Sequence, residues 1–251
     1  MSVSYSNRFQ QNTAVKDYES REYAADSYST RMWQLQRPVL AQILEKVRHE
    51  RPAPVQLLDF ACGTGRVLSW LEQFVDAADG IDISESMVDL ARTKCTKSKL
   101  FVGDILTQPE LLQKSYDVIS CFRFLLNVEP ELRKRVLCRL RETLREPDGL
   151  LLVNVHGNSR SLRHPTILWR RWRGSDGKSD VMLNEMSPAE SRNLLAECGF
   201  EIVRQFGFGI LPPTLYRTPL RGAALAVDGI LAGDHCWNNC SIDILFVCRP
   251  R

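Results

Sequence analysis

The chain has 251 residues, of which 44% are hydrophobic and 25% charged, and its formal net charge is +3. This composition excludes a disordered or fibrous chain, and the length favours one large α/β domain over two equal domains. The pI near 8.4 is too low to indicate a nucleic-acid-binding surface by itself, because such domains usually have a pI above about 9.

The sequence gives no sign of export, membrane insertion or metal binding. No apolar run reaches the roughly 18 residues of a membrane-spanning helix, and the polar N-terminus lacks the apolar core of a signal peptide. The eight cysteines form no short regular framework, which indicates reduced thiols. Cys236 and Cys240, beside His235, lack further ligands at a spacing suited to zinc. We therefore expect a cytoplasmic protein without a metal ion.

Residues 14–50 show a helical pattern that is rich in aromatic side chains and ends at Pro52 and Pro54. Two placements are open for this segment. It either caps the carboxyl edge of the following sheet or packs elsewhere on the protein.

From residue 55 onward, short runs of β-branched residues and leucine alternate with helical patterns, which is typical of a parallel sheet with crossover helices. Strands are predicted at residues 55–60, 77–82, 100–103, 116–122 and 150–155, and helices at 65–74, 84–94 and 130–144. After an insertion at 157–186, a capping box of Ser187 and Glu190 predicts a helix at 187–198. Strands at 200–206 and 241–249 close the pattern.

The stretch LLDFACGTGR (57–66) places an acid and two glycines at the end of the first strand. In such sheets ligands bind at the carboxyl ends of the strands, where a glycine lets the backbone approach a ligand closely. Asp82 ends the second strand, about where a carboxylate binds ribose hydroxyls. These features predict an adenosine-like ligand.

The same stretch disfavours a dinucleotide. The third glycine of the dinucleotide fingerprint is replaced by Leu68, and a phosphate-binding Gly-Lys-Ser/Thr loop is absent. Asp59 would repel a pyrophosphate but would suit a cationic ligand with an amine.

LLDFACGTGR resembles motif I of the class I S-adenosylmethionine-dependent methyltransferases. The stretches GIDISESMV (80–88), VGDIL (102–106) and YDVISCFRFLLNV (116–128) resemble the motifs that this family has after its next strands. The resemblance implies a doubly wound, mostly parallel sheet of seven strands with a Rossmann-like α/β fold. It implies a single domain made of an N-terminal helical cap (1–54), a cofactor-binding core (55–156) and acceptor-side insertions with a lid and closing strands (157–251).

The resemblance also implies a cofactor site for S-adenosylmethionine, with S-adenosylhomocysteine as product. Asp59, Ala61, Gly63 and Gly65 would lie beside the methionine part, although Ala61 stands where the family more often has glycine. Asp82 would bind the ribose. The other implied contacts are Asp104 and Ile105 at the adenine, Ile83 and Met87 against the adenine or ribose, and Cys121 and Phe122 near the sulfonium.

The family binds its acceptor over the ends of the fourth and fifth strands, where this chain has Arg123, Asn127, His156 and Asn158. His156 is the candidate base, because its ordinary pKa lies near working pH, or else a structural histidine. Arg123 would bind an anionic group of the acceptor or the cofactor carboxylate, or form a structural ion pair. The family's Asn/Asp-Pro-Pro signature for methylation of base and glutamine amino groups is missing after the fourth strand.

Two further segments bear on the acceptor. The insertion interleaves Trp169 with Arg170 and other cations, which would bind an anionic, flat group or form a solvated basic face. Apolar residues at helical spacing in 219–232 predict a lid, a dimer contact, a peripheral membrane contact or simple core packing.

The sequence thus predicts transfer of a methyl group to an oxygen or nitrogen atom of a small-molecule or lipid- or glycan-linked acceptor that is negatively charged, by in-line displacement. An RNA or protein methyltransferase and a non-catalytic S-adenosylmethionine-binding protein remain as alternatives. A nicotinamide-dependent dehydrogenase is disfavoured by Asp59 and by the missing glycine.

Overall fold

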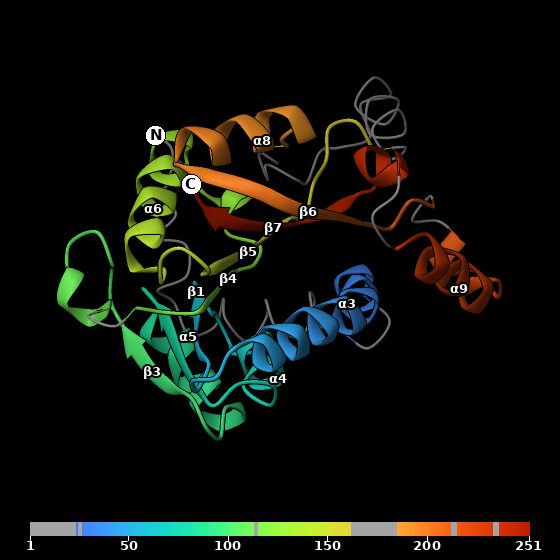
Figure 1. Cartoon of the computed structure of the whole chain (residues 1–251). Coiled ribbons are helices and arrows are strands. Elements are labelled where there is room, and N and C mark those ends of the chain that lie inside the picture. Colours follow the sequence, from blue (N-terminus) through green and yellow to red (C-terminus); the bar gives the residue numbers. More distant parts are fainter. Residues whose placement is uncertain (1–23, 25–26, 113–114, 162–184, 212–214, 233–235) are drawn as a thin grey trace, which may run out of the picture.

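A computed structural model describes residues 24, 27–112, 115–161, 185–211, 215–232 and 236–251. Its seven strands form one sheet in the order β3-β2-β1-β4-β5-β7-β6 (Figure 1). Across the described residues, no helix combines the length and the apolar character needed to cross a membrane.

The sheet is mostly parallel, as predicted. Strands β1 to β5 pair in parallel, whereas β7 runs antiparallel between β5 and β6. The strands are β1 (Gln56–Phe60), β2 (Ala77–Asp82), β3 (Lys99–Val102), β4 (Val118–Cys121), β5 (Leu150–Val155), β6 (Phe200–Phe208) and β7 (Asp243–Pro250). The predicted strand at 116–122 is shorter, because Tyr116 pairs with Leu144 in an isolated bridge before β4 begins.

The helices agree with the sequence pattern except after the glycine loop. They are α3 (Tyr28–Glu50), α4 (Leu68–Leu71), α5 (Glu85–Lys94), α6 (Pro130–Thr143), α8 (Pro188–Glu197) and α9 (Arg221–Leu231), with short 3₁₀ turns at η1 (Pro109–Leu112), η2 (Leu125–Asn127), η3 (Leu215–Arg217) and η4 (Cys236–Cys240). The helix predicted at 65–74 reduces to α4, because Gln73 and Phe74 bond three residues back as tight turns rather than four. The capping box of Ser187 and Glu190 is present as predicted.

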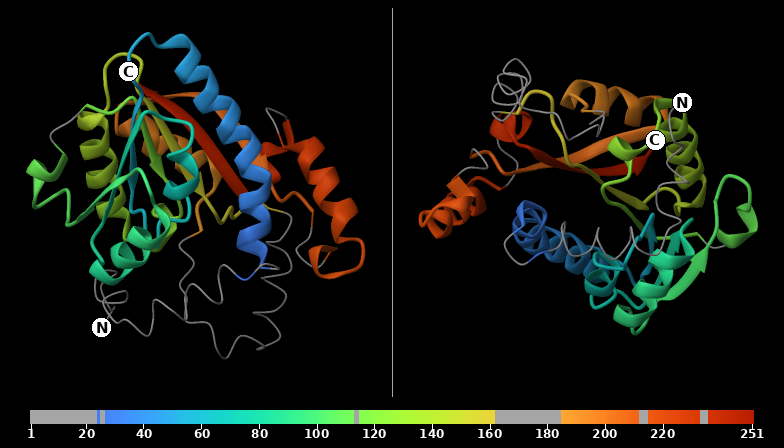
Figure 2. Two further views of the ribbon diagram at one scale, coloured as in Figure 1. Left: turned by 90° about the horizontal axis from the view of Figure 1, so that it is seen from below. Right: turned by 180° about the vertical axis from the view of Figure 1, so that it is seen from behind.

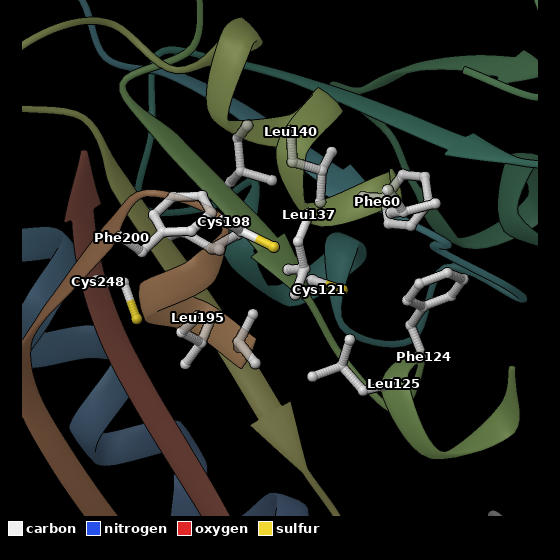
Figure 3. Packing of buried hydrophobic residues seen from close by; sticks show 14 of the residues in the cluster. Phe60, Cys121, Phe124, Leu125, Leu137, Leu140, Leu195, Cys198, Phe200 and Cys248 are labelled. Atoms are coloured by element: carbon white, nitrogen blue, oxygen red, sulfur yellow. The ribbon is translucent and has the colours of Figure 1, made fainter. Parts of the chain in front are cut away.

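Helices cover both faces of the sheet. Adjacent strand residues point to opposite faces, so Leu58 joins a core with α6 and α8, whereas Leu57 joins a core with α3 and α4. Figure 3 shows the first of these cores, where Leu137 and Leu140 of α6 pack near Leu195 of α8. The two buried layers fix the strands, and thereby the positions of the strand ends.

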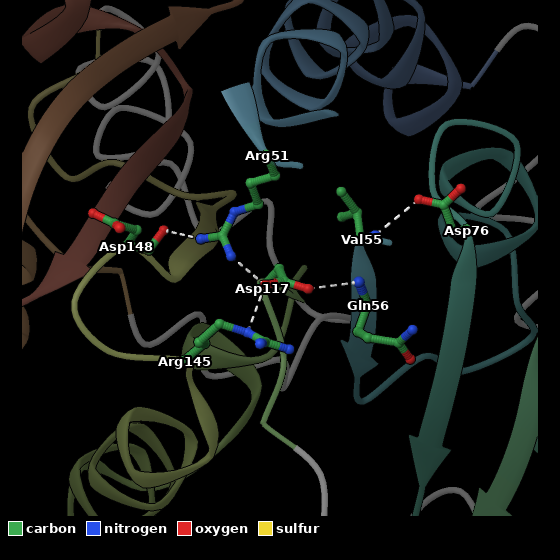
Figure 4. A network of polar contacts seen from close by, with 7 residues as sticks. All are labelled: Arg51, Val55, Gln56, Asp76, Asp117, Arg145 and Asp148. Carbon is green, nitrogen blue, oxygen red and sulfur yellow. Dashed lines mark hydrogen bonds and ion pairs between the residues drawn. The ribbon is translucent and has the colours of Figure 1, made fainter. Parts of the chain in front are cut away.

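An ion cluster around the buried carboxylate of Asp117 fixes the amino edge of the sheet (Figure 4). The carboxylate of Asp117 accepts from the side chains of Arg51 and Arg145 and from the backbone N–H of Gln56. Arg51 follows α3, so this cluster holds the C-terminal end of α3 at the amino edge. Helix α3 therefore lies along one face of the sheet (Figure 2), and Ser29 in its first turn reaches Arg123 at the carboxyl edge. Residues 14–23 of the predicted cap lie outside the described residues.

Helix α9 forms within the segment 219–232 and turns an apolar face to solvent. Leu220, Val227 and Ile230 are 63%, 42% and 77% exposed. On the opposite side the buried carboxylate of Asp228 accepts from the backbone N–H of Ile210, which ties α9 to the end of β6. Core packing therefore accounts for Ala224 and Leu225, which join the core with α3, but not for Leu220, Val227 and Ile230.

Candidate functional site

The carboxyl ends of β1, β2 and β4 border a groove made of two adjoining cavities. The polar cavity is lined by Asp59, by the loop residues 61–64 and 66–67, and by Arg123 and Asn127 after β4, among others. The apolar cavity is lined largely by Phe60, Ile81, Ile105, Leu132 and Val136. Both cavities include Ala61, Asp82, Ile83 and Phe124. They contain about 750 and 710 Å³ of empty space, part of it open to solvent.

Asp82 lies where the two cavities meet. One carboxylate oxygen accepts from the N–H of Gly63 at 2.9 Å and the other from the N–H of Ser84 at 2.9 Å. Burial raises the pKa of this carboxyl group, against the opposing effect of these hydrogen bonds. Asp82 therefore holds the glycine loop against the start of α5 and presents a carboxylate at the junction of the groove.

Asp59 is the buried acid of the polar cavity. It is 2% exposed and accepts from the Ser120 hydroxyl at 2.6 Å. Burial raises the pKa of Asp59 to about 7, although the Ser120 hydrogen bond opposes the shift. A cationic ligand in the polar cavity would favour the ionised carboxylate and would be bound by it.

The two glycines of the loop have different roles. Gly63 has a φ of +53°, and a Cβ at this position would meet no atom within 4 Å, so its backbone is open to the polar cavity. Gly65 has a φ of +73°, but a Cβ there would lie 2.8 Å from the Cβ of Ala91 and 2.9 Å from the Sγ of Cys95. Gly65 lines neither cavity; it lets α5 pack closely against the loop.

Among the residues that the structure describes, two other than glycine adopt positive φ angles, and both line the polar cavity. They are Ala61 at 55° and Arg123 at 56°. This conformation costs a residue with a Cβ about 1 kcal/mol or more, and such strain tends to occur at binding sites. The positive φ of Ala61 also explains why glycine suits this position.

The other predicted cofactor residues divide into two sets. Ile83, Met87, Asp104, Ile105 and Phe122 line the groove. Asp104 also accepts from the N–H of Leu106 at 2.9 Å, so it shapes its own turn. Cys121 is fully buried in the core beneath α6 and lines neither cavity, which leaves only its backbone near the site.

Arg123 and Asn127 line the polar cavity beyond the end of β4, joined by a hydrogen bond from the Asn127 amide to the Arg123 carbonyl. The guanidinium of Arg123 donates to the Ser29 hydroxyl at 2.8 Å. The sequence reasoning missed Arg66, which also lines this cavity and donates to the Ser29 carbonyl at 3.4 Å. The position of Arg66 directly after the glycine loop could have indicated that it lines the cavity. Nothing in the sequence indicated a role for Ser29, which is 94 residues from Arg123.

His156 follows β5 and lines neither cavity. Burial, and then the charge of Arg123, lower the pKa of the imidazole well below its ordinary value, so the ring is neutral at neutral pH. Its Nδ1 is buried and has no hydrogen-bond partner in the part of the chain that the structure describes.

Asn158 does not support its predicted role at the acceptor. It is 2% exposed, and its amide nitrogen donates to the carbonyls of Asn239 and Ser241, both at 2.8 Å. Its carbonyl oxygen accepts from the N–H of Arg160. These bonds fasten the chain after β5 to the segment before β7. Trp169 and Arg170 lie outside the described residues.

Comparisons with known proteins agree with this geometry. A family model described as a methyltransferase domain matches residues 32–205. A putative methyltransferase of Geobacillus sp. (strain WCH70) is 32% identical over 115 residues, which cover 43% of this chain and 45% of that protein. The dTDP-4-amino-2,3,4,6-tetradeoxy-D-glucose N,N-dimethyltransferase of Saccharopolyspora spinosa is 27% identical over 111 residues, covering 44% of this chain and 39% of that protein. The chain thus spans less than half the length of these curated relatives.

The fold is also similar to solved structures. The magnesium protoporphyrin IX methyltransferase of Synechocystis PCC 6803, solved with bound S-adenosylhomocysteine, matches with a TM-score of 0.60 at 14% identity. The match covers 96% of this chain and 100% of that one.

Proposed function

Because this chain belongs to the class I S-adenosylmethionine-dependent methyltransferases, we propose that it transfers a methyl group to an oxygen or nitrogen atom of a negatively charged small-molecule acceptor, free or linked to a lipid or glycan. The observation that carries the proposal is the two-part groove with Asp82 at its junction. An acid between a polar and an apolar cavity suits a ligand with an amino acid at one end, a ribose in the middle and a base at the other.

The groove residues fit this cofactor. The buried carboxylate of Asp59 would bind the amine of the methionine part, and the open face of Gly63 leaves room for the ligand to approach. Asp82 would accept from the ribose hydroxyls, and the apolar cavity would hold the adenine beside Ile105. When bound, the cofactor supplies an electrophilic methyl group on a sulfonium.

The acceptor would bind at the polar end of the groove. Arg66 and Arg123 line that end, and positive charge there favours an anionic acceptor. The relative named as a dTDP-amino-sugar N,N-dimethyltransferase is consistent with such a class of acceptor. The chain's own contribution is to align the acceptor and exclude water, and a base is needed only where the acceptor must lose a proton.

We propose that His156 is the base, because its buried Nδ1 has no hydrogen-bond partner in the described part of the chain; its lowered pKa keeps the ring unprotonated but also makes it a weaker proton acceptor than an exposed histidine. His156→Ala is expected to lower kcat by about 100-fold or more while leaving the dissociation constant of S-adenosylhomocysteine unchanged. Steady-state kinetics and calorimetry measure the two quantities. His49→Ala is the matched control, because His49 is exposed on α3. Wild-type turnover in His156→Ala would remove His156 from the reaction.

Two loop variants test how the cofactor approaches the glycines. Gly63→Ala is expected to weaken the binding of S-adenosylhomocysteine about tenfold, equal to about 1.4 kcal/mol. The added Cβ would enter the open space that the ligand is proposed to occupy, and the positive φ would cost the protein little stability. Gly65→Ala is expected to lower the free energy of unfolding by about 2 to 4 kcal/mol, because its Cβ would overlap Ala91 and Cys95. Calorimetry and urea denaturation measure these effects. Equal loss of stability in both variants would contradict the assigned roles.

The function as a whole is tested by ligand binding followed by turnover. Calorimetry should show binding of S-adenosylhomocysteine and none of NAD. Labelled S-adenosylmethionine should then transfer its methyl group to members of a panel of nucleotide-linked amino sugars and small carboxylic acids. Binding of NAD alone would refute the proposal. Transfer only to RNA or protein, or cofactor binding with no transfer to any acceptor, would favour one of the alternatives instead.

The exposed apolar face of α9 supports a contact with a second molecule beside the acceptor end of the sheet. Apolar side chains clustered on one exposed surface usually mark an interaction site, and Trp237 on η4 is 58% exposed as well. A peripheral membrane surface and a second copy of the chain both remain proposals for this contact.

A further inference from the structure

A separate cavity lies between α3 and the β6-β7 part of the sheet. We call it the basal cavity, because it borders Arg51 and the first residue of β5 at the amino edge, far from the strand ends that form the groove. It contains about 1670 Å³ of empty space, part of it open to solvent, which is more than twice the space in either half of the groove.

The inner walls of the basal cavity are apolar on two sides. Helix α3 contributes Val39, Ile43 and Val47, and the facing sheet contributes Val203, Phe206 and Val247. The walls come from a helix and from the sheet, so the cavity is a cleft and not a flat or convex surface. An apolar chain inside it would be removed from water on both sides, which stabilises binding by about 0.8 kcal/mol for each buried methylene.

Basic side chains surround these walls. Lys46, Arg51, Arg204 and Arg249 line the cavity, against two acids, Glu50 and Asp148. Lys46 pairs with Glu50, and Arg51 is held by Asp117. Within the described part of the chain no carboxylate pairs with Arg204, whose guanidinium lies 4.6 Å from the Phe206 ring centre, or with Arg249. Two guanidinium groups are thus available at the rim of an apolar cleft.

We propose that the basal cavity binds a free, single-chain anionic amphiphile such as a fatty carboxylate. The chain lies between α3 and the sheet, and the carboxylate is bound by Arg204 and Arg249, since guanidinium groups match carboxylate geometry well. A second copy of this chain is disfavoured, because a two-fold interface over this cavity would gather Arg204, Arg249 and their two equivalents into one interface. A bilayer is disfavoured because its surface cannot enter a cleft walled on both sides.

Calorimetric titration of the full chain tests the proposal with four probes. Laurate, kept below its micelle concentration, is expected to bind saturably with one molecule per chain. Dodecanol lacks the charge and acetate lacks the chain, so each is expected to bind at least about tenfold more weakly. Vesicles of anionic phospholipid are expected not to bind through this cavity. Absence of saturable laurate binding, or equal affinity for dodecanol, would overturn the proposal.

Two double variants locate the site. Arg204→Gln/Arg249→Gln is expected to weaken the binding of laurate about tenfold or more. The melting temperature and the affinity for S-adenosylhomocysteine should stay unchanged. Arg92→Gln/Arg135→Gln removes the same charge from exposed positions on α5 and α6 and should leave laurate binding unchanged. An equal loss in both double variants would show that net charge alone attracts laurate and would refute the site. If Arg204→Gln/Arg249→Gln lost vesicle binding that the wild type showed, while neither protein bound laurate, the proposed site would be refuted too.

Discussion

Asp82→Ala is expected to weaken the binding of S-adenosylhomocysteine by about 100-fold while the protein remains folded. The substitution removes the proposed acceptor of the ribose hydroxyls, and hydrogen bonds to a charged group contribute about 1.5 to 3 kcal/mol each. It also releases the N–H groups of Gly63 and Ser84, which Asp82 now holds at 2.9 Å, so the glycine loop loses its anchor to α5. Calorimetry measures the affinity, and circular dichroism on heating measures the fold.

Two further variants separate the ribose contact from loop anchoring and from charge. Asp82→Asn keeps one side-chain oxygen that can accept a hydrogen bond, but its amide nitrogen cannot accept one. The affinity for S-adenosylhomocysteine is therefore expected to lie between those of the wild type and Asp82→Ala. Asp89→Ala removes the same charge from an exposed position on α5, where Asp89 pairs with Arg92, and should bind the ligand normally. An unchanged dissociation constant in Asp82→Ala would exclude Asp82 from the cofactor site.

The sequence predicted the sheet well where local pattern and topology agree. The bounds of β2 and β5 match the predictions. β2 pairs along its length with the parallel β1, and β5, a run of apolar residues broken only by Asn154, lies between the parallel β4 and the antiparallel β7. The helix after the glycine loop was overestimated. Its apolar spacing is helical, but the chain tightens into turns before β2 begins, and periodicity alone does not distinguish the two.

The site was predicted best where its residues belong to short motifs at the ends of neighbouring parallel strands. Asp59, Gly63 and Asp82 lie at strand ends that the fold brings together, and all three line the groove. Whether the missing side chain of Gly65 faces a ligand or a helix depends on Ala91 in α5 and Cys95 just after it, so the contact of Gly65 with the methionine part stays a prediction.

Contacts between distant segments could not be read from the sequence. Ser29 bonds to Arg123 across 94 positions, and the orientation of α3 that permits this bond depends on Arg51 meeting Asp117 at the other end of the helix. Asn158 shows the converse case. It is a polar residue after an inner strand, where ligands often bind. Its amide nitrogen nevertheless donates to two backbone carbonyls that lie more than 80 residues away in sequence.

Asp59→Asn is expected to stabilise the cofactor-free protein above pH 7 and to weaken the binding of the cofactor. Burial raises the pKa of Asp59 from 3.8 to about 7, so between these values the folded protein holds a proton that the unfolded chain has released. The free energy of unfolding of the wild type therefore falls as pH rises through this window, by up to about 4 kcal/mol for a shift of about three units. Asparagine does not titrate and can still accept from Ser120. The gain in free energy of unfolding of Asp59→Asn over the wild type is therefore expected to be small at pH 4 and largest at pH 8. Urea denaturation at both pH values measures it.

The same titration predicts how the cofactor binds. S-adenosylmethionine carries positive charge and should bind the ionised form of Asp59, so wild-type affinity rises between about pH 6 and pH 8, whereas the affinity of Asp59→Asn is lower and flat across this range. Ser120→Ala is an independent check. Loss of a hydrogen bond that lowers the pKa of Asp59 should move the rise in affinity to higher pH. If the wild type and Asp59→Asn differ in stability by the same amount at pH 4 and pH 8, the buried carboxyl group does not titrate in this window, and Asp59 loses its proposed role as the partner of a cationic ligand.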